Sequence, residues 1–330
     1  MDSGPRGGDE ELAVLLSRRL GPRHPVAAAA VVSAEGTAVA VVGAGLDADF
    51  EIGSISKGVT GLLYADALRR GEVASDTTLG ELLPLGECPA AGVSLASLST
   101  HRSGLPRLPK SAQPWRRAFA LWRHGTNPYG ESLDLLLEQA RGVAVGKARP
   151  QYSNFGFELL GHALASAAST TYAELVERRV AGPLGLDPFY VPATVGELRP
   201  GAVDGRSHRG RARAPWTGEA LGPAGGIRAS IGAMARFTAA LLDGSAPGTA
   251  ALDPVADFRP GARIGAAWIT YRLKGRPVTW HNGGTGGFRS WLGLDRATGT
   301  GVVVLSATAT GVDRHGFKLL AERSGAPQEP

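Results

Sequence analysis

The chain has 330 residues, 43% of them hydrophobic and 20% charged, with a formal net charge of +5. This composition is that of an ordinary globular protein, and because basic and acidic residues are mixed along the chain we expect no nucleic-acid partner. A single cysteine, Cys88, excludes an intrachain disulfide and a cysteine-based metal cluster.

The N-terminal stretch, MDSGPRGGDEEL, is polar and acidic and lacks the basic and apolar regions of a secretion signal. The most apolar early run, residues 25–45, is too interrupted to span a bilayer, which takes about 20 apolar residues. We therefore expect a cytoplasmic protein with no membrane partner. A signal peptide removed from in front of Met1 is the alternative.

The pattern of apolar residues predicts strands at both ends of the chain and helices in the middle. Ala- and Val-rich runs at 25–33 and 37–43 predict a β-hairpin, and a helix is predicted from Ser54 until Gly71. Further helices are predicted at 154–169, 171–185, 224–244 and 311–325. Strand-like runs joined by tight turns occupy 264–273, 277–283, 288–295 and 300–308.

Consecutive antiparallel strands near the C-terminus argue against a doubly wound parallel sheet. We expect the N-terminal hairpin to pair with these strands in one antiparallel sheet. The helical middle of the chain would then be inserted between the two halves of the sheet.

Ser54 and Lys57 lie one turn apart on the first predicted helix, so their side chains share a face. Only five of the 35 basic residues are lysines, and a buried lysine, unlike arginine, can lose its proton. A neutral amine could deprotonate the serine hydroxyl, and the helix N-terminus would favour a developing oxyanion. A simple N-capping role for Ser54 is the alternative.

Tyr152 and Asn154 stand in QYSNFG, just before a predicted helix. In an extended segment residues i and i+2 point the same way, so the two side chains would face one site. A tyrosinate near a lysine ammonium could act as a general base. A buried structural tyrosine followed by a helix-capping asparagine is the alternative.

His281, Gly283 and Gly284 belong to TWHNGGTGGF. His281 and Gly283 would share a face of a strand end, where glycines let a substrate approach the backbone. A backbone N–H there could be an oxyanion donor. A plain glycine-rich hairpin turn is the alternative.

In this order, Ser-x-x-Lys, Tyr-x-Asn and His-x-Gly resemble the motifs of the penicillin-recognising serine enzymes. The segments FEIGSISKGVTGLL, LASLSTHRSGLPRL and PAGGIRASIGAMARF extend the likeness over roughly residues 25–320. The chain thus resembles the class C β-lactamase-like, penicillin-binding-protein-like serine hydrolases, and especially their family VIII esterase-like branch. That group also holds DD-peptidases and acyl-transferring relatives.

The resemblance implies an α+β fold of the β-lactamase/transpeptidase-like kind, with an antiparallel sheet flanked by helices. Residues 1–65 together with 225–330 would form the α/β domain, and 66–224 the inserted, mainly helical domain. The active site would lie at their interface.

The resemblance also implies the role of each motif residue. Ser54 would be the acylated nucleophile, Lys57 its base partner, and Tyr152 the group that carries the proton to and from the leaving group. No cofactor or metal is expected.

The substrate side of the site follows from the same resemblance. Asn154, His281 and Gly283 would bind substrate, and the backbone N–H groups of Ser54 and Gly284 would form the oxyanion hole. His281 stands where many relatives carry lysine, which would make carboxylate recognition pH-dependent near neutrality. His101, in THRSGLP, is interpreted as structural.

Two further stretches leave alternatives open. The arginine-rich residues 205–215 are interpreted as a solvated loop, with docking of an anionic substrate or acidic carrier domain as the alternative. Residues 110–125 place Trp115, Phe119 and Trp122 near one helical stripe. This stripe would pack onto the helical domain or form an apolar lid beside Ser54.

We therefore expect an intracellular serine acyl-enzyme hydrolase or acyltransferase. Its substrate would be an ester, thioester or amide of a small metabolite, and an amine or alcohol could be the acceptor. The alternatives are a β-lactamase or DD-peptidase-like enzyme and, more remotely, a non-catalytic scaffold of the same fold.

Overall fold

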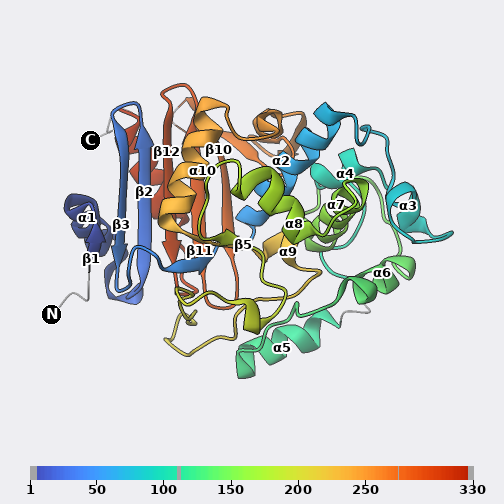
Figure 1. The fold of residues 1–330 in the computed structure, drawn as a ribbon, viewed down its shortest axis with the longest axis horizontal. Helices are drawn as coiled ribbons and strands as arrows, with labels where there is room; N and C mark the ends of the chain where they lie inside the picture. The colour runs from blue at the N-terminus through green and yellow to red at the C-terminus, as the bar shows by residue number, and fades with distance from the viewer. Residues whose placement is uncertain (1–5, 110–112, 274, 326–330) are drawn as a thin grey trace.

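The computed structural model describes residues 6–109, 113–273 and 275–325 (Figure 1). The strands are β1 (Arg6–Gly8), β2 (Ala27–Ser33), β3 (Gly36–Val42), β4 (Asp49–Glu51), β5 (Phe189–Tyr190), β6 (Arg228–Ser230), β7 (Ala256–Arg259), β8 (Ala262–Ile264), β9 (Ile269–Leu273), β10 (Arg276–Gly284), β11 (Arg289–Asp295) and β12 (Thr300–Ser306). The helices are α1 (Glu10–Leu20), α2 (Ile55–Arg70), α3 (Leu79–Leu82), α4 (Leu95–Ser99), α5 (Pro114–His124), α6 (Leu133–Arg141), α7 (Asn154–Ala167), α8 (Tyr172–Val176), α9 (Gly222–Gly225), α10 (Ile231–Asp243) and α11 (Asp313–Arg323).

A large antiparallel sheet has the strand order β1-β3-β2-β12-β11-β10-β9-β8-β7. Strand β2 of the N-terminal hairpin pairs with β12, placing Val31 opposite Val302. The predicted pairing of the two ends of the chain is therefore confirmed. In Figure 1 the sheet fills the left of the molecule, and the middle of the chain forms the helical part on the right.

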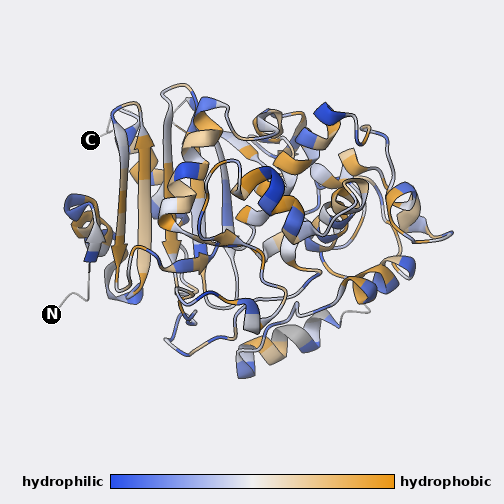
Figure 2. Cartoon of the chain, in the orientation of Figure 1, coloured by the Kyte–Doolittle hydropathy of each residue, from blue (hydrophilic) through white to orange (hydrophobic). Residues whose placement is uncertain are grey.

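Helices cover both faces of this sheet, which explains why β2 is apolar at successive positions. Ala28 and Ala30 belong to the main core, on the side of α10. Ala27 and Ala29 point the other way, into a second core shared with α1 and α11. Figure 2 shows the resulting apolar stretches along β2 and β3.

Helix α2 runs through the interior between the sheet and the helical part, in contact with α7, α9 and β10. Two glycines make this depth possible. A Cβ at Gly61 would lie 2.1 Å from the carbonyl oxygen of Ala266, and one at Gly58 would lie 2.7 Å from the ring of Trp268. Glycine at these two positions therefore lets a backbone segment and a tryptophan ring pack directly against the helix.

The predicted helix at 224–244 is wrong before Ile231, where α10 begins. Residues 228–230 form β6, which pairs with β4 and β5 in a small second sheet, and α10 begins only after Ser230, whose side chain caps it. The predicted strand at 264–273 is likewise interrupted between β8 and β9, where Ala267 has a φ of +69°. The first stretch pairs with strands distant in sequence, and the second folds back on itself so that β8 pairs with β9. Apolar periodicity reveals neither arrangement.

The predicted helix at 171–185 is also shorter than expected, because α8 ends at Val176 and a π-helical turn follows at 177–181.

The small sheet joins β5, from the middle of the chain, to β4 and β6. The division into 1–65 with 225–330 and 66–224 stays a prediction. Among the described residues, the helices are all too short or too polar to cross a membrane.

Candidate active site

Ser54 lies at the start of α2, but its side chain does not cap that helix. Gly53, just before it, has a φ of +53°, a conformation that favours glycine. A Cβ at Gly53 would lie 2.6 Å from the backbone nitrogen of Gly284. Glycine therefore lets β10 come close to the start of the helix, and the Ser54 hydroxyl is left for partners other than the backbone of α2.

Two side chains contact the Ser54 hydroxyl. Its Oγ is 3.1 Å from Lys57 Nζ and 2.7 Å from the hydroxyl oxygen of Tyr152. Lys57 is fully buried, and it also donates to the carbonyl oxygen of Ala224 in α9. The structure thus brings together the three residues predicted from two distant motifs.

Burial sets the protonation of this group. Loss of hydration lowers the pKa of Lys57 to about 7; Glu158 opposes this effect and Arg107 adds to it. Burial also raises the pKa of Tyr152 to about 12, although its hydrogen bond to Ser54 and the nearby Arg107 act the other way. Near neutral pH, Lys57 rather than Tyr152 can accept a proton, so the expected tyrosinate is not the resting form.

The ring of Tyr152 is held from several sides. The His101 ring lies 4.5 Å away between centroids, Lys57 Nζ lies 4.9 Å from the ring centre, and the Arg107 guanidinium lies 5.6 Å from it. His101 is buried with a φ of 56°, and its Nδ1 accepts from the backbone N–H of Ser153. His101 therefore supports Tyr152 and does not contact Ser54, in agreement with a structural role.

Asn154 is not among the residues that line the cleft at Ser54. It is the first residue of α7, and the capping residue is its neighbour Ser153. The Asn154 amide nitrogen donates to the hydroxyl of Tyr129 at 3.0 Å. Among the described residues its Oδ1 has no hydrogen-bond partner. A substrate-binding role for Asn154 stays a prediction.

Strand β10 forms the other wall of the site. Its pairing with β9 ends at Trp280, so the stretch that holds His281, Gly283 and Gly284 extends beyond β9 toward the start of α2. All three line the cleft. Burial and the charge of Lys57 lower the pKa of His281 to about 4. The expected titration of His281 near neutrality is therefore wrong, because the ring is buried beside a cation.

The cleft at Ser54 has a volume of about 610 Å³. Three arginines that the sequence did not single out also line it: Arg107, Arg259 and Arg289. Arg107 lies in the THRSGLPRL segment, so its region was recognised without its side chain. Arg259 lies on β7, a strand that was not predicted.

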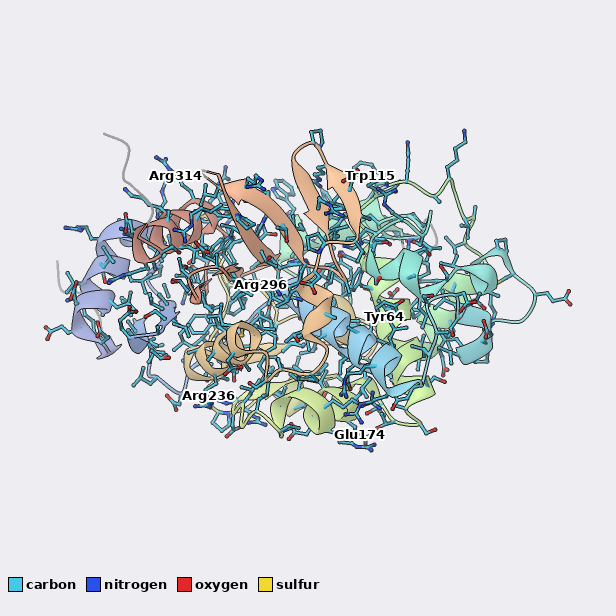
Figure 3. The ribbon with its side chains drawn as sticks, turned by 90° about the horizontal axis from the view of Figure 1, so that it is seen from above. Tyr64, Trp115, Glu174, Arg236, Arg296 and Arg314 are labelled. Atoms are coloured by element: carbon cyan, nitrogen blue, oxygen red, sulfur yellow. The ribbon has the colours of Figure 1, made fainter. Side chains whose placement is uncertain are left out.

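Helix α5 contributes Leu121 to the same cleft. Its aromatic residues do not pack onto the helical part, as one interpretation expected. Trp115, Phe119 and Trp122 are 89%, 61% and 67% exposed, and Figure 3 shows Trp115 at the surface. Of the two interpretations, only an apolar lid beside Ser54 is supported, because Leu121 lines the cleft.

Within the described ranges, no three histidine, cysteine or acidic side chains are grouped so that they could hold a metal ion. The chemistry available in the cleft is therefore that of a serine hydroxyl, an amine of lowered pKa, a phenol and backbone N–H groups. This set suits nucleophilic attack on a carbonyl carbon.

The sequence also matches known proteins. The sequence model of the beta-lactamase family matches residues 15–325. Over 153 residues the chain is 31% identical to the D-alanyl-D-alanine-carboxypeptidase/endopeptidase AmpH of Escherichia coli (strain K12). That match covers 45% of this chain and only 38% of the relative's length.

Solved structures show the same fold at low identity. The octameric penicillin-binding protein homologue from Pyrococcus abyssi superposes with a TM-score of 0.82 at 19% identity, over 96% of this chain and 77% of that one. The beta-lactamase/D-alanine carboxypeptidase from Pseudomonas syringae gives 0.79 at 17% identity, over 97% and 99%. The predicted β-lactamase/transpeptidase-like fold is confirmed.

Proposed function

This chain belongs to the beta-lactamase family of serine hydrolases, and we propose that it forms an acyl-enzyme at Ser54. The substrate would be an ester, thioester or amide of a small molecule, and the acyl group would pass to water or to an amine or alcohol. The observation that carries the proposal is the contact of Ser54 Oγ with both Lys57 Nζ and the Tyr152 hydroxyl.

Acylation would begin with neutral Lys57 taking the proton of Ser54 as Oγ attacks the carbonyl carbon. The oxyanion would accept hydrogen bonds from the N–H groups of Ser54 and Gly284. Tyr152 would then pass its hydroxyl proton to the leaving group while the bond to that group breaks, and the Lys57 ammonium would return a proton to Tyr152. The product of this step is an ester of Ser54 and the released alcohol, thiol or amine.

Deacylation would reverse these proton transfers. Water or another acceptor would attack the ester carbon while Tyr152 and Lys57 together take its proton. The bond to Ser54 Oγ would break, and the hydroxyl would regain its proton. A pKa of Lys57 near 7 supports this role, because both protonation states are populated near neutral pH.

The charge in the cleft favours an acyl substrate that carries a carboxylate. Of the charged side chains that line it among the described residues, three are arginines (Arg107, Arg259 and Arg289) and one is acidic (Asp313). His281, at the position of the lysine in many relatives, would be neutral above pH 5 and could donate only as a neutral imidazole. We propose that the arginines supply the positive charge instead.

A peptidase acting on D-alanyl-D-alanine ends, or a β-lactamase, is the second candidate. The likeness to AmpH favours it, although that likeness covers less than half of either chain. Such substrates also end in a carboxylate, so the arginines fit both candidates.

Intact-protein mass spectrometry would test the proposal. We expect a fluorophosphonate to add one adduct to the wild type and none to Ser54→Ala. A penicillin and a D-alanyl-D-alanine-ended peptide would then be compared with aryl esters. Fast turnover of penicillin or release of D-alanine would favour the second candidate, and an unmodified wild type with every reagent would refute an acyl-enzyme at Ser54.

A further inference from the structure

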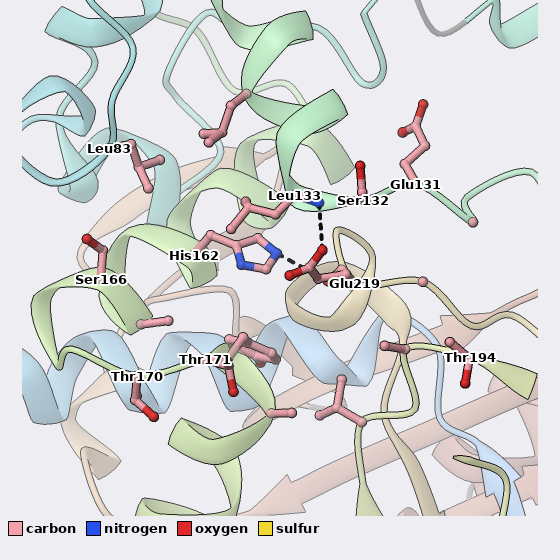
Figure 4. Close-up of a pocket in the computed structure, with 18 of the residues that line it drawn as sticks. Leu83, Glu131, Ser132, Leu133, His162, Ser166, Thr170, Thr171, Thr194 and Glu219 are labelled. Atoms are coloured by element: carbon pink, nitrogen blue, oxygen red, sulfur yellow. Dashed lines mark hydrogen bonds between the residues drawn. The ribbon is translucent and has the colours of Figure 1, made fainter. Parts of the chain in front are cut away.

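A second cavity, of about 650 Å³, lies in the helical part of the molecule (Figure 4). It is bounded by α6, α7 and α8 together with the loops after β5 and before α9, and no residue lines both this cavity and the cleft at Ser54. This volume is within the range of small-molecule sites, roughly 300–1,000 Å³. Nothing in the proposed reaction uses it.

The floor of the cavity is apolar and buried. Leu137, Ala165 and Tyr172 form it, and each is at most 6% exposed. His162 also reaches the cavity; burial lowers its pKa, and its Nε2 lies 3.2 Å from the backbone oxygen of Glu219. The floor therefore offers apolar contacts and a neutral imidazole.

The rim is acidic. Glu131, Glu197 and Glu219 line the cavity, and no lysine or arginine is found among the described residues that do so. The carboxylate of Glu219 accepts the backbone N–H of Leu133 at 2.9 Å, as the dashed line in Figure 4 shows. The carboxylate of Glu197 accepts from the backbone N–H of Ala193 and the hydroxyl of Thr194. These partners are neutral, so they do not cancel the negative charge of Glu219 and Glu197.

An apolar floor below an acidic mouth fits one kind of ligand. We propose that this cavity is an effector site for a small molecule with an apolar body and one ammonium group. The body would fill the floor, and the ammonium would lie at the rim among the carboxylates. An anionic acyl substrate would be repelled here, which separates this site from the arginine-lined cleft.

The effector role follows from what lies behind the floor, and this part rests on the proposed function of Ser54. The hydroxyl of Tyr172 is 2.7 Å from Thr60 Oγ1 on α2, and Thr60 donates to the carbonyl of Pro223 at 2.8 Å. The next residue, Ala224, accepts from Lys57. A ligand against the ring of Tyr172 is thus linked to the lysine through these hydrogen bonds and the peptide bond between Pro223 and Ala224.

Calorimetric titration of the full chain tests the site. The probe is phenethylammonium chloride, and 2-phenylethanol is its uncharged match. We expect the ammonium to bind at least about fivefold more tightly, and Glu219→Gln to weaken it by about two- to fivefold. The glutamine keeps an oxygen for the Leu133 N–H. Glu177→Gln, on the turn after α8 and outside the cavity, should change nothing.

A blocking variant locates the binding. Ala173 is an exposed residue of the cavity wall, so Ala173→Trp should fill the mouth with little effect on folding and abolish binding of the probe. Equal binding of the ammonium and the alcohol, or unchanged binding in Ala173→Trp, would overturn the site.

The effector role is tested by the rate of Ser54 modification by a fluorophosphonate, with and without the probe. We expect at least a twofold change in the wild type and a smaller one in Tyr172→Phe, which keeps the ring and removes the hydroxyl. A probe that binds and leaves the rate unchanged would overturn the effector role. If Ser54 proves unreactive, calorimetry still decides the binding site.

Discussion

Lys57 and Arg228 are both buried cations, with 0% and 1% of their surface exposed, but their surroundings differ. Arg228 donates to the carboxylates of Asp49 and Glu51 and to the backbone oxygens of Asp49 and Val203. Lys57 donates to the hydroxyl of Ser54 and to a backbone oxygen. The arginine is neutralised by two acids, whereas the lysine is bound by neutral groups.

This difference explains the use of the two residue types. Arginine remains charged in proteins, and with carboxylates on both sides it fastens β6 to β4. A buried lysine between neutral acceptors gives up its proton easily, and the pKa of Lys57 falls to about 7. One buried cation is therefore suited to structure and the other to proton transfer, and each can be tested by substitution.

The largest effect should come from Lys57→Arg, which makes the two cations alike. Arginine keeps the charge but cannot act as a base, so we expect acylation of Ser54 to slow by about 10²- to 10⁴-fold. Intact mass against time with a fluorophosphonate measures the rate.

Lys318→Arg is the matched control for this change, because Lys318 is exposed on α11. It should react like the wild type, and circular dichroism should confirm that both variants are folded. Undiminished acylation of Lys57→Arg would show that Lys57 is not the base.

Arg228→Met should strongly lower the free energy of unfolding. It leaves Asp49 and Glu51 buried without their cation, and breaking such a pair costs about 3–5 kcal/mol of the free energy of unfolding. Urea unfolding followed by circular dichroism measures it. Arg199→Met, which breaks an exposed pair with Asp187, should cost at most about 1 kcal/mol. Similar losses in the two variants would contradict the structural role of Arg228.

The contrast between the two cations also shows how far the sequence could be interpreted. Ser54, Lys57 and Tyr152 were predicted because short motifs place chemically distinctive residues at fixed spacing. The pairing of the N-terminal hairpin with the last strands was predicted from alternation and turns. Arg228 was not singled out, because it lay inside a stretch interpreted as helix and its acids come from β4.

The protonation states of two site residues were not predicted correctly. The sequence suggested a tyrosinate at Tyr152 and a His281 that titrates near neutrality, but burial moves their pKa values to about 12 and about 4. Burial depends on how α2, α7 and β10 pack together, which no local motif encodes. The arginines of the cleft were missed for the same reason, since they come from segments far apart in sequence.

The pH dependence of acylation should be set by Lys57. Its pKa is lowered from 10.5 to about 7, so below pH 7 the amine is protonated and we expect the rate to fall about tenfold per pH unit. Above about pH 8 the rate should level off. His281→Asn should leave the position of the break unchanged. A rate that stays flat between pH 5.5 and about 8 would rule out Lys57 as the titrating base.

The free energy of unfolding should also depend on pH through Lys57, because the pKa of this residue differs between the native and the unfolded protein. Between about pH 7 and pH 10.5 the unfolded chain holds a proton on Lys57 that the native protein lacks. The free energy of unfolding contributed by this residue therefore rises with pH across that window and is constant below it. Urea midpoints of the wild type and Lys57→Met, compared at pH 7 and pH 9, measure the difference. Equal changes in both proteins would contradict it.

The smallest effect should come from Arg107→Gln, which removes a cation that acts on Lys57 from a distance. The positive charge of Arg107 helps to lower the pKa of Lys57, so its loss should move the break in the rate profile to higher pH by less than about one unit. The uncharged fluorophosphonate serves as reagent, because a carboxylate substrate could also lose binding to Arg107.

The comparison is then made at two pH values. At pH 6.5 the acylation rate of Arg107→Gln should be severalfold lower than that of the wild type, by about the factor set by the shift in the pKa of Lys57. At pH 9 the two rates should be equal. Arg272→Gln, exposed on β9, should change neither rate. An equal loss at both pH values would mean that Arg107 acts by holding the ring of Tyr152, from which it lies 5.6 Å, and not by tuning the lysine. Burial alone would then account for the ease with which Lys57 gives up its proton.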